Sequence, residues 1–373
     1  MKKILHIPNY YNPHIGGIEQ TCEDIVNSLK GLYDQRIICF KDAKHSTEDI
    51  VNDIPVVRVG CQAKLASQSL AYHYKKLLTK EFVEHKPDIV IFHYPNPYVG
   101  HYLLPLLKKY SDVKFILYWH LDITKQKMLG KFFDRQTNEL LSRANRIIST
   151  SELYAKNSKF LPSVIDKVEI IPSCVSIRKV DGILLQEKII SILKDNYNKK
   201  IVFSFGRHVK HKGFDHLIEA ARLHPEYNFY LGGSGKYSET LKNKARNLSN
   251  FKFLGKLDNL SLEAYLNVSH VFAFPSLTKA EAFGLALAEA QLHGIPAVTF
   301  TIEGSGVNFV SLNNVTGLEV ANGDSKAFAD AIDKLLKDDN LRLELGENAK
   351  KRSNELFSFE AFKKHIIELV NKI

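Results

Sequence analysis

The stretch IVFSFGRHVKHKGFDHLIEAARL, residues 201–223, decides the fold class of this chain. Residues 201–206 form a strongly apolar run, which is typical of a buried strand. A cationic turn follows over residues 207–213, and a helix is expected over residues 214–223. Short β-rich runs alternate with helical segments in this way along the chain, which favours parallel sheets built from βαβ units.

Each half of the chain contains its own series of alternating strands and helices. In the first half, strands are expected at residues 4–8, 36–40, 55–59, 88–93, 114–120, 146–150 and 168–171, with helices at 18–30 and 69–84. In the second half, strands are expected at 201–206, 228–232, 251–254, 270–275, 297–300 and 317–320, with helices at 214–223, 237–248, 283–293 and 325–337. We therefore expect an α/β protein with two Rossmann-like, doubly wound parallel-sheet domains.

The expected domain bounds are residues 1–178 and 179–356. The last segment, residues 357–373, has apolar side chains at helical spacing from position 359 onward. It follows the point at which the second sheet is complete. We expect it to form a helix that packs back on the first domain.

Composition indicates a soluble globular protein. A chain of 373 residues, 45% of them apolar and 25% charged, suits two domains. The four cysteines are scattered without a CxxC pair and are interpreted as free thiols in a reducing compartment. Pro8 ends the first apolar stretch too early for a signal peptide, and no run of eighteen apolar residues can span a bilayer. A cytoplasmic protein is expected.

The formal net charge of +10 attracts polyanions or anionic lipid. Segment 124–135 mixes basic and apolar side chains: Lys125, Lys127, Lys131 and Arg135 with Met128, Leu129, Phe132 and Phe133. Such a helix can lie on an anionic bilayer, or it can face the core with a solvated basic edge. We interpret the aromatic side chains as core-facing. The basic surface as a whole is expected to contact the inner face of the plasma membrane peripherally.

Three segments carry candidate chemistry, and the first is the loop 9–17 after the first strand, which ends in Gly16 and Gly17. Glycines let backbone N–H groups approach a ligand, and the following helix N-terminus favours an anion. The nicotinamide fingerprint GxGxxG is missing. The alternative is an ordinary turn that requires a positive φ.

The second segment is the cationic turn 207–213, with Arg207 and Lys212 at the carboxyl edge of a sheet, where α/β folds bind ligands. Arginine binds phosphate bidentately and lysine acts as a point charge. The alternative is a solvated basic turn.

The third segment, EAFGLALAE at residues 281–289, places two glutamates seven residues apart. Glu281 lies just before a helix, and Glu289 lies within an apolar helix, where a carboxylate must be hydrogen-bonded. A ribose diol offers two O–H donors to Glu289, and Glu281 can hold sugar hydroxyls. The alternatives are a favourable charge at the helix dipole for Glu281 and an internal salt bridge with His293 for Glu289.

The pair Glu281 and Glu289, with Phe283-Gly284 between them, resembles the E-x7-E motif of retaining glycosyltransferase family 4, which has the GT-B fold of two domains facing a cleft. The resemblance covers essentially the whole chain. It also includes Gly16-Gly17, His120, Gly206-Arg207, Lys212-Gly213, Pro275-Ser276, Gly294-Ile295-Pro296 and Thr316-Gly317-Leu318. Residues 275–324 look most like bacterial O-antigen, capsule and lipopolysaccharide transferases.

The resemblance implies a role for each matched position. Arg207 and Lys212 bind the donor diphosphate, Glu289 binds the ribose, and Gly16 and Gly17 close over the phosphate. Glu281, Ala282, Phe283, Gly284 and Leu285 hold the transferred sugar and distal phosphate, the last four through their backbone. His120 contacts the sugar near the reacting centre, and the nucleotide base lies near Gly255, Lys256 and Leu257. His120, Glu281, Arg207 and Lys212 are thus the expected catalytic residues.

Two segments depart from the family pattern. Residues 172–176 read Pro-Ser-Cys-Val-Ser where many members carry Asn-Gly-Val-Asp after Ile-Pro, and residues 303–308 replace the usual Gly-Gly-x-x-Glu loop. The second departure can alter the donor or acceptor end of the site.

The expected activity is transfer of a hexose from a nucleotide-diphosphate sugar to a lipid-linked saccharide. GDP-mannose is preferred by resemblance alone, with UDP-hexoses open. No Asp-x-Asp triplet is present, so we expect Arg207 and Lys212 to replace a metal ion, with no cofactor required. The resemblance implies retention through front-face attack, and no second carboxylate is an obvious nucleophile.

The sequence speaks against three other classes of protein. Nucleotide-sugar 2-epimerases share the architecture but lack this E-x7-E arrangement. A non-catalytic partner subunit would have no reason to retain Glu281, Glu289, Arg207 and Lys212. A nucleic-acid-binding protein lacks support, because no helix-turn-helix, zinc or RNP signature occurs.

Overall fold

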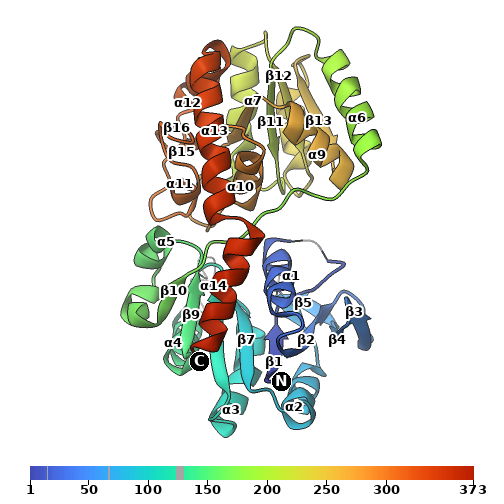
Figure 1. Cartoon of the computed structure of the whole chain (residues 1–373), viewed down its shortest axis with the longest axis vertical. Helices are drawn as coiled ribbons and strands as arrows, with labels where there is room; N and C mark the ends of the chain where they lie inside the picture. The colour runs from blue at the N-terminus through green and yellow to red at the C-terminus, as the bar shows by residue number, and fades with distance from the viewer. Residues whose placement is uncertain (15, 66–67, 123–129) are drawn as a thin grey trace. The chain divides into compact units, whose positions relative to one another are not determined.

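The computed structural model of the chain describes residues 1–14, 16–65, 68–122 and 130–373 (Figure 1). It contains two compact units: unit 1 is Met1–Ser173 with Phe359–Ile373, and unit 2 is Cys174–Ser358. The first boundary lies slightly before the expected one at residue 178. The reason is local, because Val175 donates its backbone N–H to the Phe357 carbonyl at 2.8 Å within unit 2.

Unit 1 is built on an eight-stranded sheet in the order β10-β9-β8-β7-β1-β2-β4-β3, parallel except for β3. Its strands are β1 Lys3–Ile7, β2 Asp34–Lys41, β3 Thr47–Val51, β4 Ile54–Gly60, β7 Ile89–Tyr94, β8 Lys114–Trp119, β9 Arg146–Ser149 and β10 Val168–Ile170, with a separate hairpin of β5 Ala63–Leu65 and β6 Gln68–Leu70. Its helices are α1 Gly17–Leu29, α2 Tyr74–Glu84, α3 Pro97–Lys109, α4 Gly130–Arg143, α5 Glu152–Asn157, the 3₁₀ helix η1 Leu161–Lys167 and α14 Phe359–Asn371.

Unit 2 is built on a six-stranded, wholly parallel sheet in the order β13-β12-β11-β14-β15-β16. Its strands are β11 Ile201–Phe205, β12 Asn228–Gly232, β13 Phe251–Gly255, β14 Val271–Phe274, β15 Ala297–Phe300 and β16 Gly317–Val320. Its helices are α6 Gly182–Asp195, the 3₁₀ helix η2 Lys210–Lys212, α7 Phe214–Leu223, α8 Ser238–Ala245, α9 Asn259–Val268, α10 Leu285–Leu292, α11 Val307–Val310, α12 Ser325–Lys337 and α13 Asp339–Leu356.

The central strands of unit 2 are short and apolar because helices cover the sheet. Every residue of β14 is buried, and so are the first four residues of β11. A strand that is covered on both faces has apolar residues at nearly every position and does not alternate between apolar and polar residues. This is the pattern expected of parallel sheets. The expected α/β class and the doubly wound sheets are confirmed.

The C-terminal helix α14 belongs to unit 1, where it packs against α1 (Figure 1). Its apolar stripe buries Phe362, Ile366 and Val370. Tyr33 Oη donates to Asn371 Oδ1 at 2.7 Å and fixes the end of the helix. The helix that we expected at the end of the chain is therefore present.

The expectation of a helix over residues 69–84 was wrong at its start. Residues Gln68–Leu70 form strand β6, and α2 begins only at Tyr74. The antiparallel pairing of β6 with β5 satisfies backbone groups that a helix would otherwise use. Strand β3 was missed, because its sequence TEDIV is largely polar and it lies at the edge of the sheet.

Candidate active site

The strand order of unit 2 creates a ligand-binding edge. Strands β11 and β14 are neighbours in the sheet although β12 and β13 separate them in the sequence. Val202 of β11 lies beside Phe229 of β12 on one side and Val271 of β14 on the other. At such a switch point the two following loops run in opposite directions and leave a crevice at the carboxyl ends of the strands. The loops here are residues 206–213 and 275–284.

Lys212 and Glu281 come from these two loops and form an ion pair between Nζ and Oε2. The lysine also lies over the Phe274 ring, with Nζ 5.2 Å from the ring centroid. Ser276 Oγ donates to Glu281 Oε2 at 3.3 Å. The side chains of Lys212 and Glu281 are 18% and 14% exposed, so both charges are largely removed from water while keeping one open side.

Gly213 makes this pairing possible. Its φ is +65°, and an added Cβ would collide with the Pro275 carbonyl oxygen of the neighbouring loop. Glycine tolerates both the left-handed backbone and the close approach. The cationic turn can therefore press against the loop that follows β14.

Arg207 is held differently. The backbone on either side of it is anchored, because Gly206 N–H donates to the Gly232 carbonyl at 3.1 Å and His208 N–H to the Ser234 carbonyl at 3.0 Å. The Arg207 side chain is exposed and makes no hydrogen bond or ion pair with the described residues. Its guanidinium is thus available to an anion at the same sheet edge.

Glu289 lies on α10, and its partner is Arg178, whose Nη2 donates to Glu289 Oε2 at 2.8 Å. The internal salt bridge that we considered for Glu289 is therefore present, but its partner is Arg178 and not His293. His293 Nδ1 bonds the Glu289 backbone carbonyl at 2.9 Å, and its Nε2 bonds Glu263 at 2.7 Å. Sequence reasoning missed both Arg178 and Glu263, because neither lies in a recognisable motif.

The start of α10 follows from Gly284, whose φ of +95° reverses the chain before the helix. The side chain of Phe283 is buried edge-on against Phe357, with ring centroids 5.3 Å apart, so it serves the core. Only its backbone, with that of Leu285, is available to a ligand. The first N–H groups of a helix have no intrahelical acceptor and favour an anion.

The loop that departs from the family pattern supports the Glu281 segment. Ser305 Oγ donates to the Glu281 carbonyl at 2.5 Å, and Gly306 N–H donates to the Ala282 carbonyl at 3.1 Å. Residues 303–308 therefore support the backbone of the Glu281 segment through one side-chain hydroxyl and one backbone N–H.

Gly255 and Leu257 lie at the same edge, beside the end of β12. Gly233 N–H donates to the Gly255 carbonyl at 2.6 Å, and an added Cβ on Gly232 would touch Leu257 Cδ1. The contact of Gly255 and Leu257 with a nucleotide base stays a prediction.

In unit 1, His120 follows β8 and is buried. It shares a 3.0 Å hydrogen bond between its Nε2 and His93 Nδ1, and its ring stacks on Tyr118 with centroids 4.4 Å apart. Burial lowers the pKa of His120 to about 3. The imidazole is therefore neutral at physiological pH and can act only as a neutral donor or acceptor.

Gly16 precedes α1 with a φ of −176°, which is ordinary extended backbone. The alternative of a turn that requires a positive φ is wrong for this residue. An added Cβ on Gly16 would collide with the carboxylate of Glu19, which lies in the first turn of the helix that begins at Gly17. The α1 N-terminus already holds a carboxylate, and an incoming phosphate would have to displace it.

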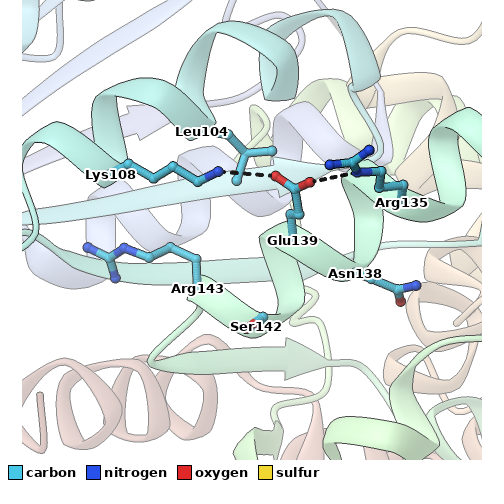
Figure 2. Close-up of a pocket in the computed structure, with 7 residues that line it drawn as sticks. All are labelled: Leu104, Lys108, Arg135, Asn138, Glu139, Ser142 and Arg143. Atoms are coloured by element: carbon cyan, nitrogen blue, oxygen red, sulfur yellow. Dashed lines mark hydrogen bonds and ion pairs between the residues drawn. The ribbon is translucent and has the colours of Figure 1, made fainter.

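Residues 124–129 of the proposed membrane segment 124–135 lie outside the described residues. Arg135 is described, and it pairs with Glu139 across 3.2 Å. Glu139 also pairs with Lys108 across 3.4 Å. Figure 2 shows Lys108 and Arg135 pointing toward Glu139 from either side. With Arg143, these side chains line a hollow of about 810 Å³. Its cations are engaged with Glu139 or, for Arg143, with backbone carbonyls, so it presents no convergent anion site.

Within the described residues, His224, Glu226 and Asp333 are the group whose geometry could hold a metal ion. Glu226 precedes β12, so the group lies at the amino edge of the unit 2 sheet, away from the loops of Lys212 and Glu281. Asp333 is also bonded to Lys337 at 2.8 Å. No helix in the described part of the chain is long and apolar enough to cross a bilayer.

Two family models match the chain, one described as Glycosyltransferase Family 4 over residues 15–179 and one as Glycosyl transferases group 1 over residues 186–352. The O-antigen chain mannosyltransferase C of Escherichia coli is 24% identical over 360 residues, 95% of this chain and 94% of that protein. The D-rhamnosyltransferase WbpZ of Pseudomonas aeruginosa is 25% identical over 368 residues, 95% of this chain and 92% of that protein. The crystal structure of Anabaena HepE with UDP and glucose matches all of both chains with a TM-score of 0.80 at 18% identity.

Proposed function

Since this chain is a glycosyltransferase of family 4 with the GT-B fold, we propose that it moves a hexose from a nucleotide-diphosphate sugar to a lipid-linked saccharide with retention of configuration. The relative named as an O-antigen chain mannosyltransferase supports a role in surface polysaccharide formation. The expected family assignment is confirmed. The donor, stereochemistry and acceptor are the proposal.

The pairing of Lys212 with Glu281 at the unit 2 switch point carries the proposal. A donor that enters this edge meets the Lys212 ammonium and the Arg207 guanidinium on one loop and the α10 N-terminus on the other. These groups are suited to the diphosphate that departs, because Glu281 holds Lys212 in place before the reaction starts and the exposed Arg207 guanidinium is free to bind an anion. One such preorganised group can be worth about 3 kcal/mol in the transition state.

The reaction that fits these groups is front-face displacement. The acceptor hydroxyl oxygen forms a bond to the anomeric carbon as the bond from that carbon to the phosphate oxygen breaks. The acceptor proton passes to the departing phosphate. Glu281 holds sugar hydroxyls in this scheme, and His120, neutral because burial lowers its pKa to about 3, contacts the sugar as a hydrogen-bonding group.

We further propose that Arg207 and Lys212 take the place of a metal ion. The group of His224, Glu226 and Asp333, whose geometry could hold a metal ion, lies at the opposite edge of the unit 2 sheet from Arg207 and Lys212. Its position is the one feature of this group that supports the proposal. A transfer rate that is unchanged by excess chelator is expected. A rate that chelation abolishes and Mg²⁺ restores would remove this part of the proposal.

GDP-mannose is the preferred donor, with UDP-hexoses as the alternative. The preference is supported by the mannosyltransferase named above, while the UDP and glucose in HepE support the alternative. The net charge of +10 supports an acceptor presented at an anionic membrane surface from the cytoplasmic side. Flotation with anionic liposomes that salt reverses is expected, and absence of such binding would contradict it.

The test is a thermal-shift screen with UDP, GDP and ADP, followed by sugar transfer. A ligand that binds only the folded form raises the melting temperature, by an amount equivalent to about 2.7 kcal/mol at a hundred times Kd. We expect one nucleoside diphosphate to do so. Arg207→Ala should remove most of that shift, whereas Arg246→Ala in the same unit, outside the site, should not. Equal shifts in both variants would refute the site.

A further inference from the structure

Arg178 links Glu289 to a second carboxylate. The residue follows the boundary of unit 2, just beyond the segment 172–176 that departs from the family pattern. Its Nη2 donates to Glu289 Oε2 at 2.8 Å and its Nη1 to Glu263 Oε1 at 3.3 Å. The Arg178 side chain is 21% exposed, so this is a largely buried guanidinium between two carboxylates.

Glu263 anchors the arginine. Its side chain is 1% exposed, and its Oε1 also accepts the backbone N–H of Arg178 at 2.9 Å. Its Oε2 bonds His293 Nε2 at 2.7 Å. Burial raises the pKa of Glu263, but hydrogen bonds from His293 and Arg178 outweigh it and hold the pKa below its usual value. Both oxygens of Glu263 are therefore engaged, and Arg178 is fixed at its backbone and its side chain.

Unlike Glu263, Glu289 has a carboxylate oxygen that can still accept a hydrogen bond. Its side chain is 18% exposed, and in the described part of the chain its Oε1 has no hydrogen-bond partner. Burial raises the pKa of Glu289, and the Arg178 guanidinium offsets this only in part. Without the arginine the carboxyl group would take up a proton more readily. A protonated carboxyl group accepts fewer hydrogen bonds from a diol.

We propose that Arg178 is the positioning residue for ribose recognition: anchored on Glu263, it holds the Glu289 carboxylate ionised and oriented so that the oxygen left open accepts the ribose hydroxyls. This rests on the proposed nucleotide-sugar site. In this proposal the preference for ribonucleotides over 2′-deoxynucleotides depends on Arg178, which contacts the Glu289 carboxylate and not the nucleotide.

The proposal separates ribose recognition from phosphate binding, and an experiment can measure the two apart. Affinities are measured by calorimetry for UDP and GDP and for their 2′-deoxy counterparts. A hydrogen bond to a charged group is worth roughly a ten- to hundredfold difference in affinity. We expect the wild-type chain to prefer the ribonucleotide by about that factor.

In Arg178→Gln the preference should fall to within roughly threefold, while the 2′-deoxynucleotide binds about as well as to the wild-type chain. Arg178→Lys, which keeps a charge but not the fork of donors, should keep part of the preference. The matched control is Arg222→Gln, which removes an arginine paired with the exposed Glu219 elsewhere in unit 2. The control should leave both affinities unchanged.

The outcomes distinguish failure of the proposed nucleotide-sugar site from failure of the role proposed for Arg178. A wild-type chain that binds none of the four nucleotides overturns the proposed function itself. A wild-type chain that prefers ribose, with Arg178→Gln keeping that preference, overturns only the role of Arg178. An equal loss of affinity for ribo- and 2′-deoxynucleotides in a folded Arg178→Gln variant shows a structural role and also overturns it.

Discussion

Replacing Lys212 by methionine separates what the Lys212–Glu281 pair contributes to stability from what it contributes to transfer. Removing one partner of a fully buried ion pair costs about 3–5 kcal/mol, because a charge is left without a partner. Here the two side chains are 18% and 14% exposed, and Ser276 still donates to Glu281. We therefore expect a loss of about 2 kcal/mol for Lys212→Met.

For a unit of this size that loss lowers the melting temperature by about 4–8 °C, which scanning fluorimetry measures directly. Turnover should fall further than stability suggests. Loss of one preorganised cation of about 3 kcal/mol lowers kcat roughly a hundredfold. The assay is release of nucleoside diphosphate from the donor that the wild-type chain uses, at a temperature where both proteins are folded.

A second variant makes the reasoning refutable. In Lys212→Met with Glu281→Gln, no unpaired charge remains, so the melting temperature should return to within a few degrees of the wild-type value. Turnover should not return, because both groups act on the donor. If turnover rises together with stability, the pair is structural and the argument for a diphosphate site at this edge is lost.

Two further predictions concern acid stability and loop support. Burial lowers the pKa of His6 to about 4 and of His120 to about 3, and holds that of His93 well below 6.5, so the unfolded state binds more protons below pH 6.5. Stability should thus fall as pH is lowered from 6.5 towards 4, by up to about 1.4 kcal/mol per pH unit for each group; equal urea midpoints at pH 7 and pH 5 would contradict this. In Gly306→Ala the new Cβ would collide with the Ala282 carbonyl oxygen, so we expect a fall in kcat of more than about tenfold in a folded chain; wild-type kcat would show that the loop tolerates the methyl group.

Much of the fold could be predicted because strands buried on both faces have an unmistakable sequence. Runs such as VFAF in β14, which lie between segments with helical spacing, are typical of strands buried on both faces. The strands that were missed, β3 and the hairpin of β5 and β6, are polar or short. Their pairing depends on neighbours that are distant in sequence, and periodicity does not carry that information.

The candidate site could be predicted in part for a similar reason. Lys212 and Glu281 follow strands that the doubly wound order makes neighbours, so their meeting follows from the topology. Arg178 reaches Glu289 only because the chain passes α9 and α10 as it enters unit 2, and no pattern in the sequence marks that path. The partner of a buried carboxylate is a question of three-dimensional packing, and for Glu289 the guess from helical spacing chose the wrong cation.

The ion pairs of the site predict which of its two cations, Arg207 or Lys212, contributes more to the affinity for a nucleoside diphosphate. In the part of the chain that the structure describes, Lys212 is committed to Glu281, whereas Arg207 is exposed and has no acceptor. A diphosphate that binds here competes with the Glu281 carboxylate for Lys212. It has no such competitor for the Arg207 guanidinium. Arg207→Ala should therefore weaken the affinity for UDP or GDP more than Lys212→Ala does, and by a larger factor at low ionic strength, because an exposed cation is screened by salt. Calorimetry at two salt concentrations tests the ranking: a larger loss from Lys212→Ala would mean that the ion pair with Glu281 breaks when the nucleotide binds.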